Sequence, residues 1–214
     1  MENSHPRGSL PRVLTIAGTD PTGGAGVQAD LKAFMAAGAY GMSVVTALVA
    51  QNTQGVRSVH TPPLEFLQAQ LDAVLDDVTV DAVKIGMLGN AEITATVDKF
   101  LDQLAPSTPV VLDPVMVATS GDRLLDEQAE AAVRQLCRKA TVITPNLKEL
   151  AVLTDTPQAQ TFEEATDIAQ RWAAFTGTAV IVKGGHLSSD DAGNAAVSAD
   201  GVLVQVSSCL LSTS

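Results

Sequence analysis

The chain has 214 residues, of which 46% are hydrophobic and only 3% aromatic, and its formal net charge is −11. This length and the aliphatic composition are typical of one α/β domain in which helices cover a parallel sheet. The acidic surface argues against nucleic acid and anionic membranes as main partners, because like charges repel.

The chain begins with a polar segment, residues 1–12, that contains two prolines and lacks the apolar core of a signal peptide. We expect this segment to be a disordered leader, followed by a single domain over residues 13–214. The two cysteines, Cys137 and Cys209, fit neither a disulfide framework nor a zinc site, and Cys137 is expected in the core. No apolar run approaches the length of a membrane span, which makes the cytoplasm the expected location.

Apolar strand-like runs alternate with amphipathic helical patterns along the chain. Strands are expected at 13–17, 41–50, 82–87, 110–112, 141–144 and 179–182, with a turn at Asn52 and Gly55 before a β-like stretch to His60, and a hairpin over 195–206 that turns at Asp200-Gly201. One helix is expected after the first strand, and its buried face is expected to carry Val27, Leu31, Phe34 and Met35. A second helix is expected at 64–78, and its buried residues are expected to be Phe66, Leu67, Leu71, Val74, Leu75 and Val78. Further helices are expected at 91–104, 127–138, 146–153 and 162–175. Repeated βα units predict a mainly parallel sheet with helices on both faces.

A glycine-rich loop with Gly23, Gly24 and Gly26 joins the first strand to the first helix. Such a loop brings backbone N–H groups and a helix N-terminus up to a ligand. No lysine follows the glycines, which excludes a P-loop. A dinucleotide fingerprint also needs an acidic residue about 20 positions further on, where Gln51 and Asn52 follow an apolar run instead. We therefore expect the loop to hold a small polar organic substrate.

Polar residues that directly follow strands are further candidates, because ligands of α/β sheets bind beyond the carboxyl ends of the strands. The amide of Gln51 has a donor and an acceptor suited to the edge of a heterocycle, although simple turn chemistry also explains Gln51-Asn52. Asp113 follows an apolar strand and is a candidate metal ligand, directly or through water, with a local cap as the alternative.

The later strands lead to three more candidates. Asn146 and Glu149 have the spacing of a capping box, which satisfies helix N–H groups by itself, but beside Asp113 they could also hold magnesium-bound water. Lys183 leaves a hydrophobic strand just before two glycines, where it is suited to contact phosphate oxygens. The alternative is a solvated lysine before a turn, and His186 after the glycines is expected to be structural.

Taken together, these segments resemble the hydroxymethylpyrimidine/phosphomethylpyrimidine kinases of thiamine biosynthesis, which are ribokinase-like enzymes. The motifs are Ala-Gly-Thr-Asp-Pro-Thr-Gly-Gly-Ala-Gly-Val-Gln-Ala-Asp at 17–30, Thr-Ala-Leu-Val-Ala-Gln-Asn-Thr-Gln-Gly-Val at 46–56, Lys-Ile-Gly-Met-Leu at 84–88, Asp-Pro-Val-Met at 113–116, Thr-Pro-Asn-Leu-Lys-Glu at 144–149 and Val-Lys-Gly-Gly-His at 182–186. They follow the order of the family and extend the resemblance over residues 13–206.

The resemblance implies a three-layer αβα sandwich with a mainly parallel central sheet. It also implies that ATP, with Mg²⁺, phosphorylates 4-amino-5-hydroxymethyl-2-methylpyrimidine and then its monophosphate. By this resemblance the pyrimidine pocket is lined by Gly18, Asp30, Gln51, Met87 and Val115. Asp113, Asn146 and Glu149 would organise magnesium around the ATP phosphates, and Lys183 would neutralise charge on the phosphoryl group in flight.

One family motif has no counterpart where the resemblance places it. The family's late Gly-Thr-Gly-Cys segment, whose backbone N–H groups form an anion hole, is expected near residue 210 and beyond. Residues 207–214 contain Cys209 but no glycine, so Cys209 is not assigned that role. We therefore expect a domain that is incomplete at its C-terminal end, through fragmentation, a shifted reading frame or degeneration, and poor or absent catalysis as a result.

Two alternatives to a pyrimidine kinase stay open from the sequence. Several motifs also fit pyridoxal-type kinases, whose substrate is another hydroxymethyl heteroaromatic. A catalytically defective pyrimidine-binding protein is the second alternative. The expected partners are a small pyrimidine and ATP, without nucleic acid or membrane, and a homodimer is a possible assembly.

Overall fold

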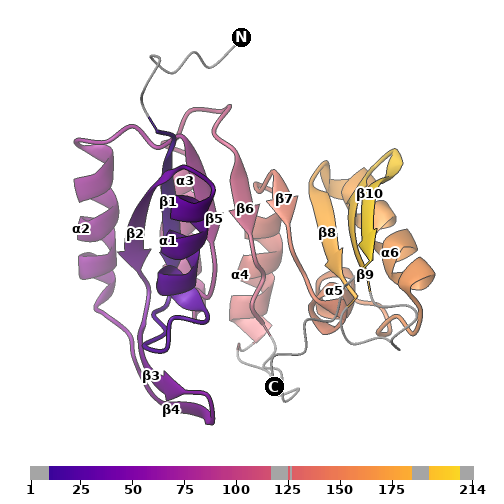
Figure 1. Cartoon of the computed structure of the whole chain (residues 1–214), viewed down its shortest axis with the longest axis horizontal. Helices are drawn as coiled ribbons and strands as arrows, with labels where there is room; N and C mark the ends of the chain where they lie inside the picture. The colour runs from indigo at the N-terminus through magenta and orange to yellow at the C-terminus, as the bar shows by residue number, and fades with distance from the viewer. Residues whose placement is uncertain (1–9, 117–124, 126, 185–192, 208–214) are drawn as a thin grey trace. The chain divides into compact units, whose positions relative to one another are not determined.

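The computed structural model describes residues 10–116, 125, 127–184 and 193–207, whose course is drawn in Figure 1. Over these residues the chain has an α/β fold with a mostly parallel central sheet of eight strands and a separate two-stranded sheet. The expected fold class is thereby confirmed. The chain divides into two compact units, Met1–Val111 with Leu125–Val133 and Leu112–Leu124 with Arg134–Ser214.

The first unit is built from βα repeats. Its elements are β1 (Arg12–Ala17), α1 (Gly26–Ala36), β2 (Tyr40–Val45), β3 (Leu48–Asn52), β4 (Gly55–His60), α2 (Leu64–Leu75), β5 (Ala82–Ile85) and α3 (Ala91–Leu101). Strand β1 pairs in parallel with both β2 and β5, and α1 packs against β1 and β2 (Figure 1). The apolar runs that predicted these strands are buried, with Leu14, Ile16 and Ile85 at 0% exposure.

Strand β1 begins at Arg12, within the segment expected to be a leader. The backbone N–H and the Nε of Arg12 both donate to Asp81 Oδ2, at 2.8 and 3.0 Å. This ion pair ties the start of β1 to the residue before β5, and sequence polarity alone does not reveal it. Residues 1–9 lie outside the described residues.

The single strand expected over 41–50 is wrong, because β2 ends at Val45 and β3 starts at Leu48. The chain leaves the main sheet at Thr46, whose N–H donates to Ala17 O at 3.0 Å and whose Oγ1 donates to Met87 O at 2.7 Å. Strand β3 then pairs antiparallel with β4 through the expected turn, and this hairpin projects from the end of β2 (Figure 1). The break coincides with this hydroxyl–carbonyl contact between distant residues, which the apolar pattern does not encode.

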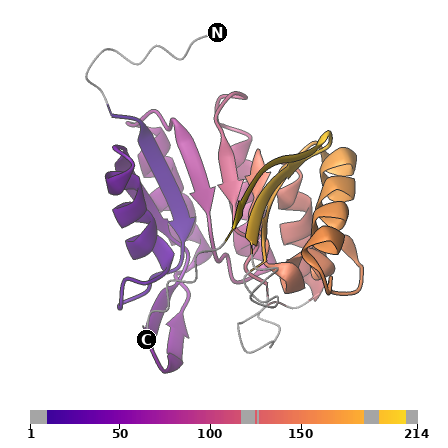
Figure 2. The same cartoon turned by 45° about the vertical axis from the view of Figure 1, so that its right-hand side comes forward.

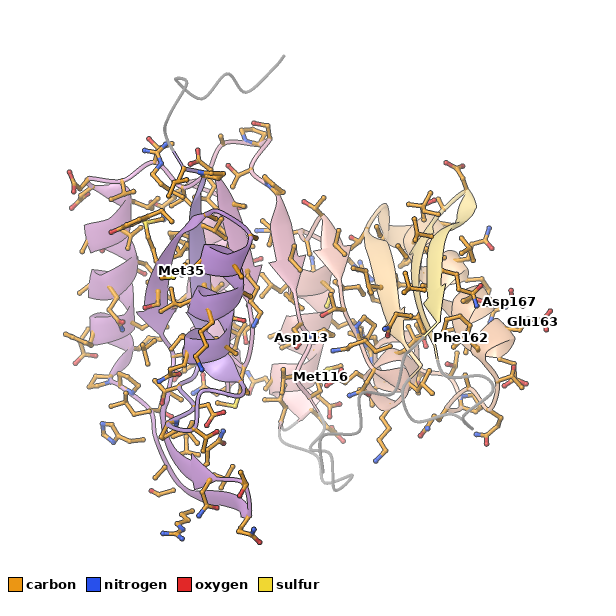
Figure 3. All side chains as sticks on the ribbon, in the orientation of Figure 1. Met35, Asp113, Met116, Phe162, Glu163 and Asp167 are labelled. Atoms are coloured by element: carbon orange, nitrogen blue, oxygen red, sulfur yellow. The ribbon has the colours of Figure 1, made fainter. Side chains whose placement is uncertain are left out.

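Two residues expected on buried helix faces are exposed. Met35 on α1 is 79% exposed (Figure 3), and Phe66 on α2 is 58% exposed. Each lies one position away from the side chains that face the sheet, such as Leu67 on α2, which is 1% exposed. One position is a rotation of about 100° around a helix, so an apolar neighbour of the buried stripe can still face solvent.

The second unit continues the α/β pattern and ends in an antiparallel hairpin. The boundaries between the two units fall within strand β6 (Val110–Leu112) and helix α4 (Glu127–Cys137). The remaining elements of the second unit are β7 (Val142–Ile143), α5 (Leu147–Thr154), α6 (Phe162–Thr176), β8 (Ala179–Lys183), β9 (Gly193–Ser198) and β10 (Gly201–Ser207). Strands β7 and β8 are parallel, whereas β9 pairs antiparallel with β8 and β10. Helix α6 packs along β8 and β9 (Figure 2).

Several sequence-based expectations are confirmed in this unit. The final hairpin turns before Gly201, which has a positive φ of 121°. Cys137 is fully buried, and burial raises the pKa of its thiol to about 12, so it is an inert core residue. Cys209 lies outside the described residues.

No helix in the described ranges combines the length and apolar character needed to cross a bilayer.

Candidate functional site

The glycine loop after β1 is organised by a buried carboxylate, that of Asp20, which is 3% exposed. Its Oδ1 accepts hydrogen bonds from the backbone N–H and hydroxyl of Thr22, at 2.9 and 2.8 Å. Its Oδ2 accepts from the N–H groups of Gly24 and Ala25, at 3.1 and 2.8 Å. The carboxylate therefore closes the loop onto itself and orders the chain up to the start of α1.

The same carboxylate interacts with one predicted substrate residue, Gln51. A hydrogen bond from the Gln51 side chain is the largest cause that lowers the pKa of Asp20, followed by those from Thr22 and Ala25, while desolvation opposes the shift. The hairpin that carries Gln51 is also tied to the loop, because Thr19 N donates to Ala47 O and Thr19 Oγ1 accepts from Val49 N, both at 2.9 Å. Gln51 thus reaches the glycine loop through a contact between distant residues.

Gly18 and Met87, two more predicted pocket residues, lie side by side. A Cβ on Gly18 would stand 2.8 Å from Met87 Cε, closer than side chains approach. The position of Met87 is set by its backbone O, which accepts from Thr46 Oγ1 at 2.7 Å. The glycine therefore makes room for the methionine side chain, and both follow parallel strands, β1 and β5.

Asp30, the fourth predicted pocket residue in the first unit, is engaged in an ion pair. Its Oδ2 accepts from Thr15 Oγ1 at 2.6 Å and from Lys84 Nζ at 2.9 Å. Its side chain is 15% exposed and that of Lys84 is 23% exposed. Lys84 was not a candidate from the sequence, because a lysine inside a strand pattern carries no signal of its partner.

A second group of candidate residues lies in the second unit. Lys183 Nζ stands 2.8 Å from Asp113 Oδ1, and Thr144 Oγ1 donates to the same oxygen at 2.9 Å. Asp113 directly follows β6 (Figure 3), and Lys183 ends β8. The parallel bridge between Asn146 and Lys183 continues the sheet from β7 to β8. The ends of three strands therefore bring an acid, a hydroxyl and a lysine into contact.

The predicted capping box at the start of α5 is confirmed. Glu149 N donates to Asn146 Oδ1 and Asn146 N donates to Glu149 Oε2, both at 2.9 Å. Glu149 is 3% exposed, and burial raises its pKa, with Asp113 acting in the same direction. Lys183 and the backbone of Asn146 lower the pKa, but burial is the largest cause. A nearby cation would favour the ionised form of such a buried carboxylate.

The donor set of this cluster fits magnesium that keeps most of its water. Asp113 uses Oδ1 for both of its side-chain contacts, so its Oδ2 has no hydrogen-bond partner among the residues the structure describes. In the same ranges no group of three or more His, Cys, Asp or Glu side chains is close enough to cage a metal. Mg²⁺ is commonly held by one or two carboxylates together with water and substrate phosphates, which matches Asp113 and Glu149.

Val115, the last predicted pocket residue, lies in the second unit and is half-buried. Its N–H donates to Asp113 O at 2.9 Å, in the short turn after β6. Gly185, His186 and Cys209 lie outside the described residues. The roles of all nine predicted site residues stay predictions.

Sequence reasoning assigned no role to two residues that organise the candidate sites, Asp20 and Thr144. Asp20 is one of the polar residues just beyond the strand ends, and Thr144 stands at the end of an expected strand. In both cases the useful signal is position: Thr144 directly follows β7, and Asp20 comes three residues after the end of β1. Their partners are distant in sequence, so spacing alone could not identify them.

Comparisons with known proteins agree on one family. Residues 20–213 match the family model described as phosphomethylpyrimidine kinase. The thiamine biosynthesis multifunctional protein ThiED of Corynebacterium glutamicum is 58% identical over 96% of this chain, which spans 27% of that protein. The hydroxymethylpyrimidine/phosphomethylpyrimidine kinase of Escherichia coli is 51% identical over 83% of this chain, which spans 66% of that protein.

Two solved structures have the same fold. The crystal structure of phosphomethylpyrimidine kinase from Clostridium difficile 630 superposes with a TM-score of 0.84 and 37% identity, covering 92% of this chain and 84% of that one. An ADP complex of Bacillus subtilis pyridoxal kinase superposes with a TM-score of 0.82 and 32% identity, covering 96% and 77%.

Proposed function

The chain belongs to the phosphomethylpyrimidine kinase family, and on that premise we propose that it phosphorylates 4-amino-5-hydroxymethyl-2-methylpyrimidine and then the monophosphate. In the first reaction the hydroxymethyl oxygen bonds to the γ-phosphorus of ATP. The bond from that phosphorus to the β–γ bridging oxygen breaks, ADP leaves, and the proton of the hydroxyl group is released to solvent. In the second reaction the phosphate of the product accepts another phosphoryl group in the same way.

The contact between Lys183 and Asp113 is the observation that carries the proposal. Phosphoryl transfer depends mainly on positioning and on stabilising negative charge. Lys183 supplies a cation at a strand end, and the 2.8 Å contact to Asp113 holds its Nζ in place. Asp113 and Glu149 are the residues proposed to hold Mg²⁺ through water, and the metal would offset charge on the ATP phosphates when bound.

We propose that Gln51, Gly18, Asp30 and Met87 of the first unit recognise the pyrimidine. The amide of Gln51 can donate to a ring nitrogen or accept from the amino group. Its amide lies near enough to Asp20 to lower the pKa of that carboxylate. Met87 beside Gly18 supplies a soft apolar wall for a flat ring.

A pyridoxal-type kinase is the second candidate function. It is favoured by the 32% identity to a pyridoxal kinase over nearly the whole chain. Its substrate would meet the same half-buried Gln51 and Met87, because a hydroxymethyl group on a flat heteroaromatic ring is common to both alcohols.

Parallel assays of the purified chain with Mg-ATP separate these functions. We expect mass spectrometry to show slow formation of the pyrimidine monophosphate and then the pyrophosphate, because residues 207–214 contain no glycine for the family's anion-hole motif. Pyridoxal should be turned over more slowly still. Faster turnover of pyridoxal would establish the second candidate. Calorimetric binding of the pyrimidine without any product would instead identify a binding protein, and neither binding nor product would refute the proposal.

A further inference from the structure

A cavity of about 310 Å³ lies in the second unit, apart from the cluster around Lys183. Its walls come from the end of α4, the end of α5 and one face of α6. Asn146 of the candidate site caps the beginning of α5, whereas Asp155, which caps its end, lines the cavity. The eight residues of α5 make it about 12 Å long at 1.5 Å per residue, so the cavity and the cluster stand at opposite ends of this helix.

Three arginines line the cavity, although the protein as a whole is strongly acidic. Arg134 lies in the last turn of α4, and Arg138 directly follows the end of that helix. Arg171 comes from α6. Asp155 is the one acidic residue that lines the same cavity, so its lining carries a net positive charge.

A purely structural role explains only one of these arginines. Arg134 Nη2 donates to Val152 O at 2.7 Å, which caps a carbonyl near the end of α5. Arg138 instead lies over the ring of Phe175, 5.1 Å from its centroid. Neither Arg138 nor Arg171 has an ion pair with a carboxylate among the residues that the structure describes. Their charge is available to a ligand.

The aromatic wall of the cavity adds a second observation. Trp172 lines the cavity beside Phe175 and is 7% exposed. Its buried Nε1 has no hydrogen-bond partner in the described part of the chain, which is rare for a buried donor in a native protein. Because this nitrogen has almost no exposed surface, it offers no hydrogen bond to a ligand, and only the exposed part of the indole ring lines the cavity.

We propose that this cavity binds a small aromatic phosphate monoester. Arg138 and Arg171 contact the phosphate, because guanidinium groups match its oxygens in pairs, and Trp172 and Phe175 contact the ring. The volume is at the low end of the range for ligand pockets, about 300 to 1,000 Å³, which suits one ring and one anionic group. This site does not depend on the proposed kinase activity.

The single tryptophan makes the proposal directly testable. The fluorescence of Trp172 is recorded while phenyl phosphate is titrated into the full chain. We expect a saturable change, and at least tenfold weaker binding of inorganic phosphate, which lacks the ring. The absence of a saturable change at millimolar phenyl phosphate, or equal affinity for both probes, would overturn the proposal.

Four variants locate the binding. Arg171→Gln and Arg138→Gln should each weaken phenyl phosphate at least tenfold. Arg57→Gln, which makes the same charge change on the exposed strand β4, should leave affinity unchanged, and so should Lys183→Gln in the phosphoryl-transfer cluster. If Arg138→Gln fails to fold because it loses the Phe175 contact, Arg171→Gln decides. Equal affinity of Arg171→Gln and the parent chain, or a loss in Lys183→Gln instead, would refute the site.

Discussion

Lys183 Nζ and Asp113 Oδ1 lie 2.8 Å apart, although 70 residues separate them in the sequence. Asp113 comes after β6 and Lys183 ends β8, so the contact depends on both strands and on Thr144 between them. The lysine side chain is 39% exposed and the aspartate side chain 30%, which leaves both accessible to a substrate.

Replacing the lysine tests its role in phosphoryl transfer. We expect Lys183→Ala to lower kcat by about 10²- to 10³-fold, the usual effect of removing one group that stabilises transition-state charge. KM for the pyrimidine should change little, because Lys183 is not among the proposed ring contacts. Steady-state kinetics checks this, with Lys99→Ala on the exposed side of α3 as the matched control. An unchanged kcat would remove Lys183 from the mechanism.

Two substitutions of Glu149 separate its capping role from its charge. Glu149→Gln keeps an oxygen that can accept from Asn146 N, so the capping box survives and no charge is buried. We expect its stability at neutral pH to equal or exceed that of the parent, while kinase activity falls. Glu149→Ala loses the cap and should cost about 1 kcal/mol. Urea denaturation measures both, and equal activity of Glu149→Gln and the parent would show that the carboxylate serves the fold alone.

Asp20 should make the stability of the chain sensitive to acid. Because its pKa in the folded state lies below the ordinary value, the unfolded state takes up the proton first as pH falls. The stabilisation is complete above about pH 4, where an unfolded aspartate is ionised, and is lost as pH falls further toward the folded pKa.

Asp20→Asn should remove that part of the acid dependence and destabilise the chain at neutral pH. Both carboxylate oxygens accept from N–H or O–H donors, so the amide NH₂ of asparagine must face a donor. We expect a loss of about 2 to 3 kcal/mol. Urea denaturation between pH 7 and pH 3 measures it, with the exposed Asp76→Asn as control. A parallel acid profile in Asp20→Asn and the parent chain would contradict the assignment.

The pairing of Gly18 with Met87 predicts a selective loss of substrate affinity. In Gly18→Ala the new Cβ meets only the end of a flexible side chain at 2.8 Å, so the fold should survive while Met87 moves into the pocket. Pyrimidine affinity should fall at least tenfold by calorimetry. Gly26→Ala is a contrasting variant, because its Cβ would clash with the backbone O of Gly18 at a φ of +57°. Gly26→Ala should therefore lose stability outright.

Gln51 is expected to orient the pyrimidine ring. Removing one neutral hydrogen bond costs about 1 kcal/mol, and an unsatisfied partner raises this to about 3 kcal/mol, so Gln51→Ala should weaken pyrimidine binding by about 5- to 150-fold. Gln54→Ala, at the exposed turn of the same hairpin, is the matched control. The hypothesis fails if calorimetry gives the two variants the same affinity.

The features that the sequence determined by itself are local. The capping box joins Asn146 and Glu149, three residues apart, and the hairpin before Gly201 needs only a short turn. The alternation of strands and helices follows from apolar periodicity, which repeats within each element. The interactions that produce these features lie within a few residues, so the order of the amino acids is sufficient to predict them.

Tertiary structure alone decided which distant groups meet. The expected strand ends at Thr46, which contacts Met87, and the Gln51 side chain interacts with Asp20. Lys84 forms an ion pair with Asp30, and three arginines line the same cavity as Trp172. Each of these contacts depends on strand register and side-chain direction, which are fixed only when the sheet forms. A local pattern carries neither quantity, because the same residues at the same spacing can face any neighbour that the fold brings to them.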